Sequence, residues 1–275
     1  MSNPAAPEQA RRNKEPEPPT FGAALTRERG DFTWVYLWSA PIRAMHWLAA
    51  LCILTLIVTG FFIGRPYFMT SGEASAHFLM GWVRFIHFAA AGVLVMTGIV
   101  RVYWLFAGNR FERLPALFPI APTNLKNLVR TAVAYGTLRP EKQPNFVGHN
   151  PLQQYSYTGI YALTALMVVT GFTLYGQSNP HGLIFRVFSW LPPLVGGLQH
   201  VRFVHHIATW GFIIFILLHV YFAIRSDYIE RAGGVSSIFT GGRYIPMNES
   251  YEDYTVADVP AQDRRTGEFR APGAE

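Results

Sequence analysis

Two histidines in the last apolar stretch of the chain have the spacing of two metal ligands on one helix face. His205 and His219 are fourteen residues apart, and at about 100° per residue a helix returns the second ring to within about 40° of the first. A rise of about 1.5 Å per residue puts about 21 Å between them, most of the depth of a bilayer core. Imidazoles placed in this way are suited to hold two stacked haems that carry electrons across a membrane.

Two further histidines match this pair in depth. His46 lies near the start of the first apolar stretch and His87 near the start of the second. If successive spans alternate in direction, His46 lies at the level of His219, and His87 at the level of His205. Ionisable side chains inside a membrane are rare and usually functional. We therefore predict two iron sites with two histidine ligands each, an inner pair of His46 and His219 and an outer pair of His87 and His205.

The remaining histidines are weaker candidates for iron ligands. His206 is thirteen residues before His219, so it points about 220° away, to the opposite helix face. It is expected to meet a haem propionate, a partner protein or lipid headgroups. His149, just before the third apolar stretch, is expected at the surface or the membrane interface. Three more are expected in outer loops: His77, His181 and His200.

The cysteine content limits the type of haem. Cys52 is the only cysteine, so the chain has neither a CxxCH attachment motif nor the ligands of a cysteine-held iron–sulfur cluster. Any haem is therefore bound without covalent attachment, which makes it b-type. Cys52 itself is expected to be a small core residue.

The histidines must be positioned by long apolar helices. The chain has 275 residues, of which 50% are hydrophobic and only 15% charged, below the charge content of an ordinary soluble domain. Four stretches have the length of about 20 residues that a bilayer requires. Four such stretches with so few charges argue against the buried helices of a soluble protein, and we predict an all-α membrane protein built as a four-helix transmembrane bundle. The predicted spans are residues 42–63, 84–106, 155–175 and 202–224.

The distribution of lysine and arginine predicts the orientation of the spans. Six basic residues precede or begin the first span, seven lie between residues 101 and 142, and six follow from residue 225 onward. Only four lie on the other side of the four predicted spans. Since positive charge collects in cytoplasmic segments, both termini are expected in the cytoplasm. The net charge of +6 is then a matter of topology and anionic lipid contact, and nucleic-acid binding is not expected.

The segments outside the spans divide the chain. Residues 1–30 are polar and proline-rich, which predicts a disordered cytoplasmic tail without a cleavable signal peptide. Residues 31–245 are predicted to form the dihaem domain, and residues 246–275 a second cytoplasmic tail. The segment NLKNLVRTAVAYG (residues 124–136) has apolar residues at helical spacing, which predicts a short helix. It could lie in the membrane interface or on the soluble side.

Charged and small residues accompany the predicted ligands. Four arginines lie about one turn from a ligand and could pair with haem propionates, although arginine also snorkels at membrane boundaries. They are Arg43 and Arg225 on the inner side, and Arg84 and Arg202 on the outer side. Glycines in the spans allow close approach of a macrocycle or of a neighbouring helix. They are Gly60, Gly92, Gly98, Gly159, Gly171 and Gly211.

Two separated motifs carry a resemblance to a known family. The first is RAMHWL at residues 43–48, followed by Thr59 and Gly60. The second is RFVHHIATW at residues 202–210, followed by Phe215 and His219. Together with NPLQQ at residues 150–154, these motifs resemble the b-type cytochrome subunit of membrane-bound nickel–iron uptake hydrogenases. The similarity covers roughly residues 30–245.

The resemblance implies a function for the whole chain. A cytochrome of this family is an electron-transfer subunit, not an enzyme on its own, in the bacterial cytoplasmic (inner) membrane. It would anchor a periplasmic nickel–iron hydrogenase, whose large and small subunits dock through the small subunit. Electrons from hydrogen oxidation would cross on two b haems and reduce a quinone near the cytoplasmic face. In this family the positions matching Asn150, Gln153 and Tyr221 are implicated in quinone binding, although polar residues also commonly cap a span.

Two other functions fit part of the pattern. A cytochrome b anchor of another quinone-linked dehydrogenase, of the formate dehydrogenase type, also has four spans and the fourteen-residue histidine spacing. A membrane transporter that binds haem transiently would need a gated path, and the sequence has no broken-helix signature for one. The R-x-x-H-W and R-x-x-H-H motifs favour the hydrogenase subunit.

Overall fold

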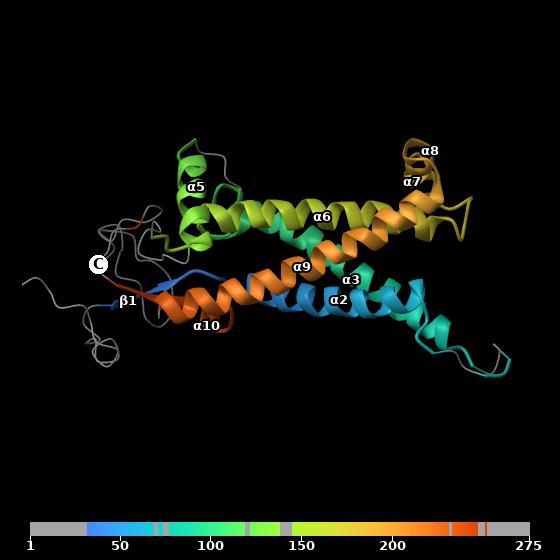
Figure 1. Ribbon diagram of the computed structural model, residues 1–275, viewed down its shortest axis with the longest axis horizontal. Helices are drawn as coiled ribbons and strands as arrows, with labels where there is room; N and C mark the ends of the chain where they lie inside the picture. The colour runs from blue at the N-terminus through green and yellow to red at the C-terminus, as the bar shows by residue number, and fades with distance from the viewer. Residues whose placement is uncertain are drawn as a thin grey trace, which may run out of the picture.

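Four long helices dominate the computed structural model of the chain (Figure 1). The structure describes residues 32–68, 71–73, 77–118, 122–137, 145–230, 233–246 and 251. The long helices are α2 (Ala40–Gly64), α3 (Leu79–Ala107), α6 (Pro151–Gly176) and α9 (Leu198–Glu230). All four are long and apolar enough to cross a membrane, which confirms the prediction of a four-helix membrane bundle. Each is longer than the span predicted from the sequence, and α9 shows the largest difference because it continues past residue 224 to Glu230.

The four helices associate as two pairs. α2 packs along α3, and α6 packs along α9. α2 also contacts α9, a helix of the second pair. In Figure 1, α9 runs obliquely across the bundle. Large apolar side chains point outward from these helices, among them Leu51, Val58 and Leu217. An apolar outer surface is what a lipid-facing bundle requires, because lipid tails replace the protein core as its neighbours.

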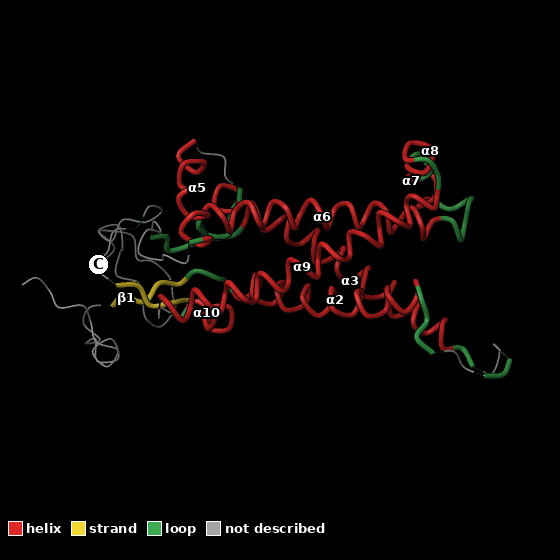
Figure 2. The backbone as a smooth tube through the Cα atoms, in the orientation of Figure 1, coloured by secondary structure: helices red, strands yellow, loops and turns green. Residues whose placement is uncertain are grey.

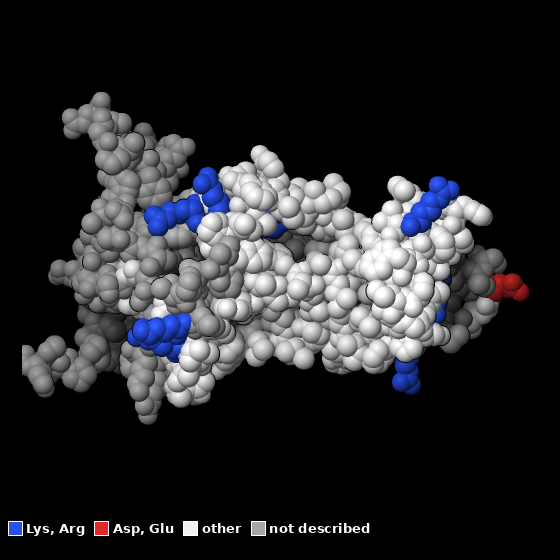
Figure 3. All heavy atoms as spheres, turned by 90° about the horizontal axis from the view of Figure 1, so that it is seen from above, with Lys and Arg blue, Asp and Glu red and all other residues white. Residues whose placement is uncertain are grey.

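The charged side chains lie at the ends of the bundle and leave its middle apolar (Figure 3). On the face drawn in Figure 3, lysine and arginine lie near the two ends of the bundle, and a broad band between them carries no charged side chain. Such a band agrees with the apolar length that a bilayer would cover.

The start of α6 is encoded by a local motif. The Asn150 side chain accepts a hydrogen bond from the backbone N–H of Gln153, and the Gln153 side chain accepts one from the backbone N–H of Asn150. This capping box satisfies two backbone donors that the first turn would leave free. Pro151 follows at the first helical position, where its missing N–H costs nothing.

Shorter helices cover the two ends of the bundle (Figure 2). At one end, α5 (Pro122–Gly136) confirms the helix expected between the second and third spans. It contacts α6 with Thr131 and Ala134 buried, while Val129 and Val133 are exposed. The exposed valines favour the interface position over the soluble-side position. The remaining short helices are α4 (Leu114–Leu117), α7 (Leu183–Phe188), α8 (Leu191–Val195) and α10 (Gly234–Thr240).

A small sheet, which the sequence analysis did not predict, joins two distant parts of the chain. β1 (Phe32–Tyr36) pairs antiparallel with β2 (Gly242–Pro246), and Trp34 lies opposite Tyr244. We call this end of the bundle the sheet end, because α2 begins and α3 and α9 end there. The sheet thereby ties the start of the first long helix to the segment that follows the last one.

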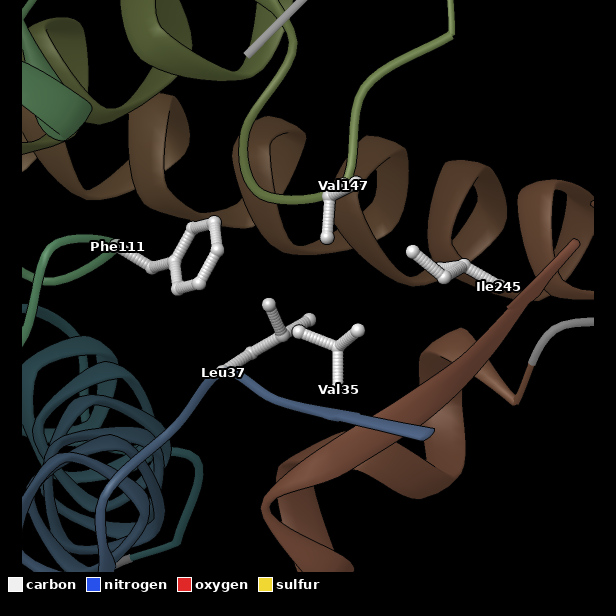
Figure 4. Packing of buried hydrophobic residues seen from close by; sticks show 5 residues of the cluster. All are labelled: Val35, Leu37, Phe111, Val147 and Ile245. Carbon is white, nitrogen blue, oxygen red and sulfur yellow. The ribbon is translucent and has the colours of Figure 1, made fainter. Parts of the chain in front are cut away.

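A compact apolar cluster supports the sheet (Figure 4). Its side chains come from both strands, from the residue after β1, and from the loops that follow α3 and precede α6. They are Val35, Leu37, Phe111, Val147 and Ile245, all nearly fully buried. Next to it, the buried Glu112 carboxylate accepts hydrogen bonds from the backbone N–H groups of Ser39 and Asn109 and from the Trp104 indole. The sheet end is therefore an ordered core outside the membrane-spanning part.

Candidate haem-binding site

The inner pair of histidines comes together between two helices. His46 of α2 and His219 of α9 face each other with ring centroids 6.3 Å apart and planes inclined by 50°. A metal–imidazole bond of about 2 Å on each side, with about 1 Å from each nitrogen to its ring centre, needs about 6 Å between centroids. The spacing of the two rings thus fits one iron held from both sides.

Aromatic rings surround this inner pair. Phe215, one turn before His219 on α9, stacks on its imidazole at 5.5 Å and 9°. Trp47 lies edge-on to His46 at 5.2 Å. The Nδ1 atom of His46 is buried and has no hydrogen-bond partner. Apolar rings without charge are suitable neighbours for a neutral, metal-binding imidazole.

The outer pair lies at the other end of the bundle. His87 lies in the first third of α3 and His205 in the first third of α9, both toward the end of the bundle opposite the sheet (Figure 1). Each ring makes a hydrogen bond to a threonine of the helix packed beside it. His87 Nδ1 lies 2.8 Å from Thr59 Oγ1, and His205 Nδ1 lies 2.8 Å from Thr170 Oγ1.

His206 points elsewhere. Its ring packs edge-on against Phe61 of α2 at 5.4 Å, and its Nδ1 lies 3.8 Å from where a Cβ on Gly64 would be. His205, by contrast, turns toward α6. The two neighbouring histidines therefore contact different helices, His205 contacting α6 and His206 contacting α2. Iron ligation by His205 in place of His206 stays a prediction, for which a test is given below.

Two of the candidate glycines lie beside the outer rings. A Cβ built on Gly60 would lie 3.3 Å from His87 Cε1, and one built on Gly171 would lie 3.3 Å from His205 Cε1. Gly211 instead faces Leu163 of α6, a helix–helix contact. In the described part of the chain, no neighbouring atom lies within 4 Å of a Cβ placed on the other three glycines, which are Gly92, Gly98 and Gly159.

The four candidate arginines have different surroundings. Arg43 donates to the Phe239 carbonyl of α10, and its Nε is buried without a partner. Arg225 lies over the Tyr135 ring of α5 at 5.5 Å. Arg84 and Arg202, at the opposite end, are exposed. The Arg202 guanidinium donates a hydrogen bond to the Gln199 side chain in the same helix. Their pairing with haem propionates stays a prediction.

The three candidate quinone residues lie on two different helices. Asn150 and Gln153 lie together at the start of α6, where their side chains form the capping box. Tyr221 lies on α9, where its ring is 54% exposed and packs edge-on against Phe222. The capping box already gives two of the three residues a role in starting the helix.

His149, just before α6, is half-buried and does not lie free at the surface. Its ring packs between Trp38 and Tyr157, each at 4.7 Å. Burial, with a smaller contribution from nearby Arg101, lowers the pKa of His149 to about 3. Its Nδ1 has no hydrogen-bond partner. The sequence could not reveal this, because Trp38 is more than a hundred residues away and meets His149 only through the sheet end.

Acidification is expected to destabilise the sheet end through His149. Between its ordinary pKa of 6.5 and the folded value of about 3, the unfolded chain binds a proton that the folded chain does not. The free energy of unfolding therefore falls as pH drops through this window, by at most about 1.4 kcal/mol per pH unit. Thermal unfolding in detergent from about pH 7 to about pH 5 measures this slope. His149→Gln should flatten it; an unchanged slope in that variant would contradict the assignment.

Comparison with known proteins identifies the family. The model of the family described as prokaryotic cytochrome b561 matches residues 37–241. A protein of Cupriavidus necator is 39% identical over 210 residues, covering 76% of this chain and 86% of its own length. One from Rhizobium leguminosarum bv. viciae is 37% identical, covering 78% and 91%. Both are named "Probable Ni/Fe-hydrogenase B-type cytochrome subunit".

A more distant relative agrees. A protein of Escherichia coli (strain K12), named "Probable Ni/Fe-hydrogenase 1 B-type cytochrome subunit", is 31% identical over 214 residues, covering 76% of this chain and 90% of its own length. Such names denote electron-transfer components that bind haem b, and the four apolar helices make the chain a multi-pass membrane protein. This chain belongs to the prokaryotic cytochrome b561 family, among the b-type cytochrome subunits of nickel–iron hydrogenases.

Proposed function

We propose that this chain anchors a periplasmic nickel–iron hydrogenase to the bacterial cytoplasmic membrane and conducts its electrons to the quinone pool, with two b haems as carriers. The observation that carries the proposal is the arrangement of four histidines in two pairs, one near each end of a membrane bundle. The family and the names of its relatives support the hydrogenase as the electron source.

The two histidine pairs, at different depths in the membrane, would each hold one haem iron. His46 and His219 would hold the inner iron, and His87 and His205 the outer iron. Two histidine ligands leave iron no open position, and haem held in this way supplies one-electron transfer instead of oxygen chemistry. The apolar outer surface of the helices keeps water away from both pairs, which suppresses competing reactions.

The orientation follows from charge. Most of the basic residues in the described part of the chain lie toward the sheet end, and the sequence has only four on the other side of the spans. We therefore assign the sheet end and both termini to the cytoplasm. The hydrogenase small subunit then docks at the opposite end, near α7 and α8, where Leu183, Trp190 and Leu194 are exposed. Quinone is reduced near the sheet end, where Asn150, Gln153 and Tyr221 are the candidate contacts. Arg43 and Arg225 at this end, and Arg84 and Arg202 at the opposite end, are the candidate partners of the haem propionates.

Quinone reduction by membranes tests the proposal. Membrane vesicles containing the assembled complex should reduce an added quinone when supplied with hydrogen. Vesicles from a strain without this chain should lose that activity, while the hydrogenase still reduces a soluble dye with hydrogen. The dye control shows that the hydrogenase itself is intact. Unchanged quinone reduction without the chain would contradict the proposal.

A further inference from the structure

The two outer histidines are held by matching segments of two different helices. Thr59 of α2 bonds to His87 of α3, and Thr170 of α6 bonds to His205 of α9, each with 2.8 Å between Oγ1 and Nδ1. Both threonines lie in the same four-residue sequence, Val-Thr-Gly-Phe, at residues 58–61 and 169–172. The two helix pairs thus present their outer histidines in the same way.

The direction of each bond follows from the hydroxyl hydrogen. Thr59 donates its hydroxyl to the Thr55 carbonyl at 2.7 Å, and Thr170 donates to the Leu166 carbonyl at 2.7 Å. A hydroxyl has one hydrogen, so its oxygen must accept from the imidazole. The ring hydrogen then lies on Nδ1, and Nε2 keeps the free lone pair that binds a metal.

The glycine after each threonine makes room for the ring. With a Cβ 3.3 Å from the histidine Cε1, an alanine at Gly60 or Gly171 would push the imidazole away from the helix. The hydroxyl and the bare backbone therefore fix both the tautomer and the position of each outer ring. His46 of the inner pair is held differently, because its buried Nδ1 has no hydrogen-bond partner among the described residues.

We propose that Thr59 and Thr170 are positioning residues that orient the two outer ligands and lower the reduction potential of the iron between them. This inference rests on the proposed ligation of iron by His87 and His205. A hydrogen bond from Nδ1–H makes the imidazole a more basic ligand. A more basic ligand favours the oxidised, more positively charged iron, so the potential falls. A lower potential at the outer iron favours electron transfer from it to the iron of the inner pair.

Valine substitutions test the role of the hydroxyls. Thr59→Val and Thr170→Val keep the shape of the side chain but remove the hydrogen bond. Thr59→Ser and Thr170→Ser keep the hydroxyl. Thr97→Val is the matched control, because Thr97 is as buried as Thr59 and donates its hydroxyl to the Val93 carbonyl of its own helix. Potentiometric titration of the b haems in the purified complex is the main readout, with haem content per chain as the second.

The expected result is specific to one haem. Each valine variant should raise the potential of one titration step and leave the other in place, and the double variant should raise it further. Loss of a bond of this kind typically weakens metal affinity by about 10- to 100-fold, so the valine variants should also lose haem on dilution. The serine variants and Thr97→Val should match the parent protein. If the double variant does not assemble, the single variants give the same test.

Two outcomes would overturn the inference. One is a titration unchanged by either valine variant; the other is an equal shift of both steps, which would indicate general loosening of the bundle. Failure of the proposed function looks different. Without haem ligation the parent complex would contain no b haem that titrates in two steps, and without the hydrogenase role both steps would titrate but hydrogen would not reduce the haems.

Discussion

Replacing His205 with alanine is expected to remove one of two b haems, whereas replacing His206 leaves both. The reason is geometric, since His205 turns toward Thr170 and the outer site while His206 packs against Phe61. An iron that loses one of its two histidines loses most of the affinity of its site. Haem content per chain, measured on the purified complex, should fall to about half in His205→Ala.

The neighbouring variant supplies the control for this result. His206→Ala removes a ring of the same size, one residue along the same helix, and should retain full haem content. A loss of haem in His206→Ala with full content in His205→Ala would reverse the assignment of the outer ligand. It would also show that α9 is rotated relative to the arrangement described above.

Removing the inner ligand is expected to stop electrons part of the way across the membrane. His219→Ala should lose the inner haem but keep the outer one, because the outer pair and its threonine bonds lie at the other end of the bundle. Hydrogen should still reduce the remaining haem. Hydrogen-dependent quinone reduction should fall by at least about 100-fold, since transfer over the roughly 21 Å between the two histidine levels lacks its second carrier.

A histidine elsewhere on the same helix provides the comparison. His200 lies in the first turn of α9, is exposed, and bonds to the Gly196 carbonyl at 2.9 Å. His200→Ala should keep both haems and full quinone reduction. If His219→Ala retains both haems, or reduces quinone as fast as His200→Ala does, the inner site has been assigned to the wrong residues.

The sequence predicts the membrane-spanning part of this protein well, because helical periodicity is a local property. Fourteen residues between His205 and His219 are enough to place both rings on one face. The depth match of His46 with His219 needs only the alternation of spans, and the structure brings these two rings within 6.3 Å.

The parts that were missed depend on contacts between distant segments. The pairing of β1 with β2 joins residues about two hundred positions apart, and each strand is too short to give a clear alternating pattern. The burial of His149 depends on that same sheet end. The bond between Thr59 and His87 likewise needs the register of α2 against α3, which sequence spacing does not fix.

The most direct test of the central claim is the optical difference spectrum of native membranes under hydrogen, with dithionite as the reference reductant. We predict that hydrogen reduces b-type haem, and that this signal disappears when the chain is deleted. If dithionite reduces a b haem of this chain but hydrogen does not, the cytochrome takes its electrons from another donor, and its proposed role as the electron conduit of a hydrogenase is wrong.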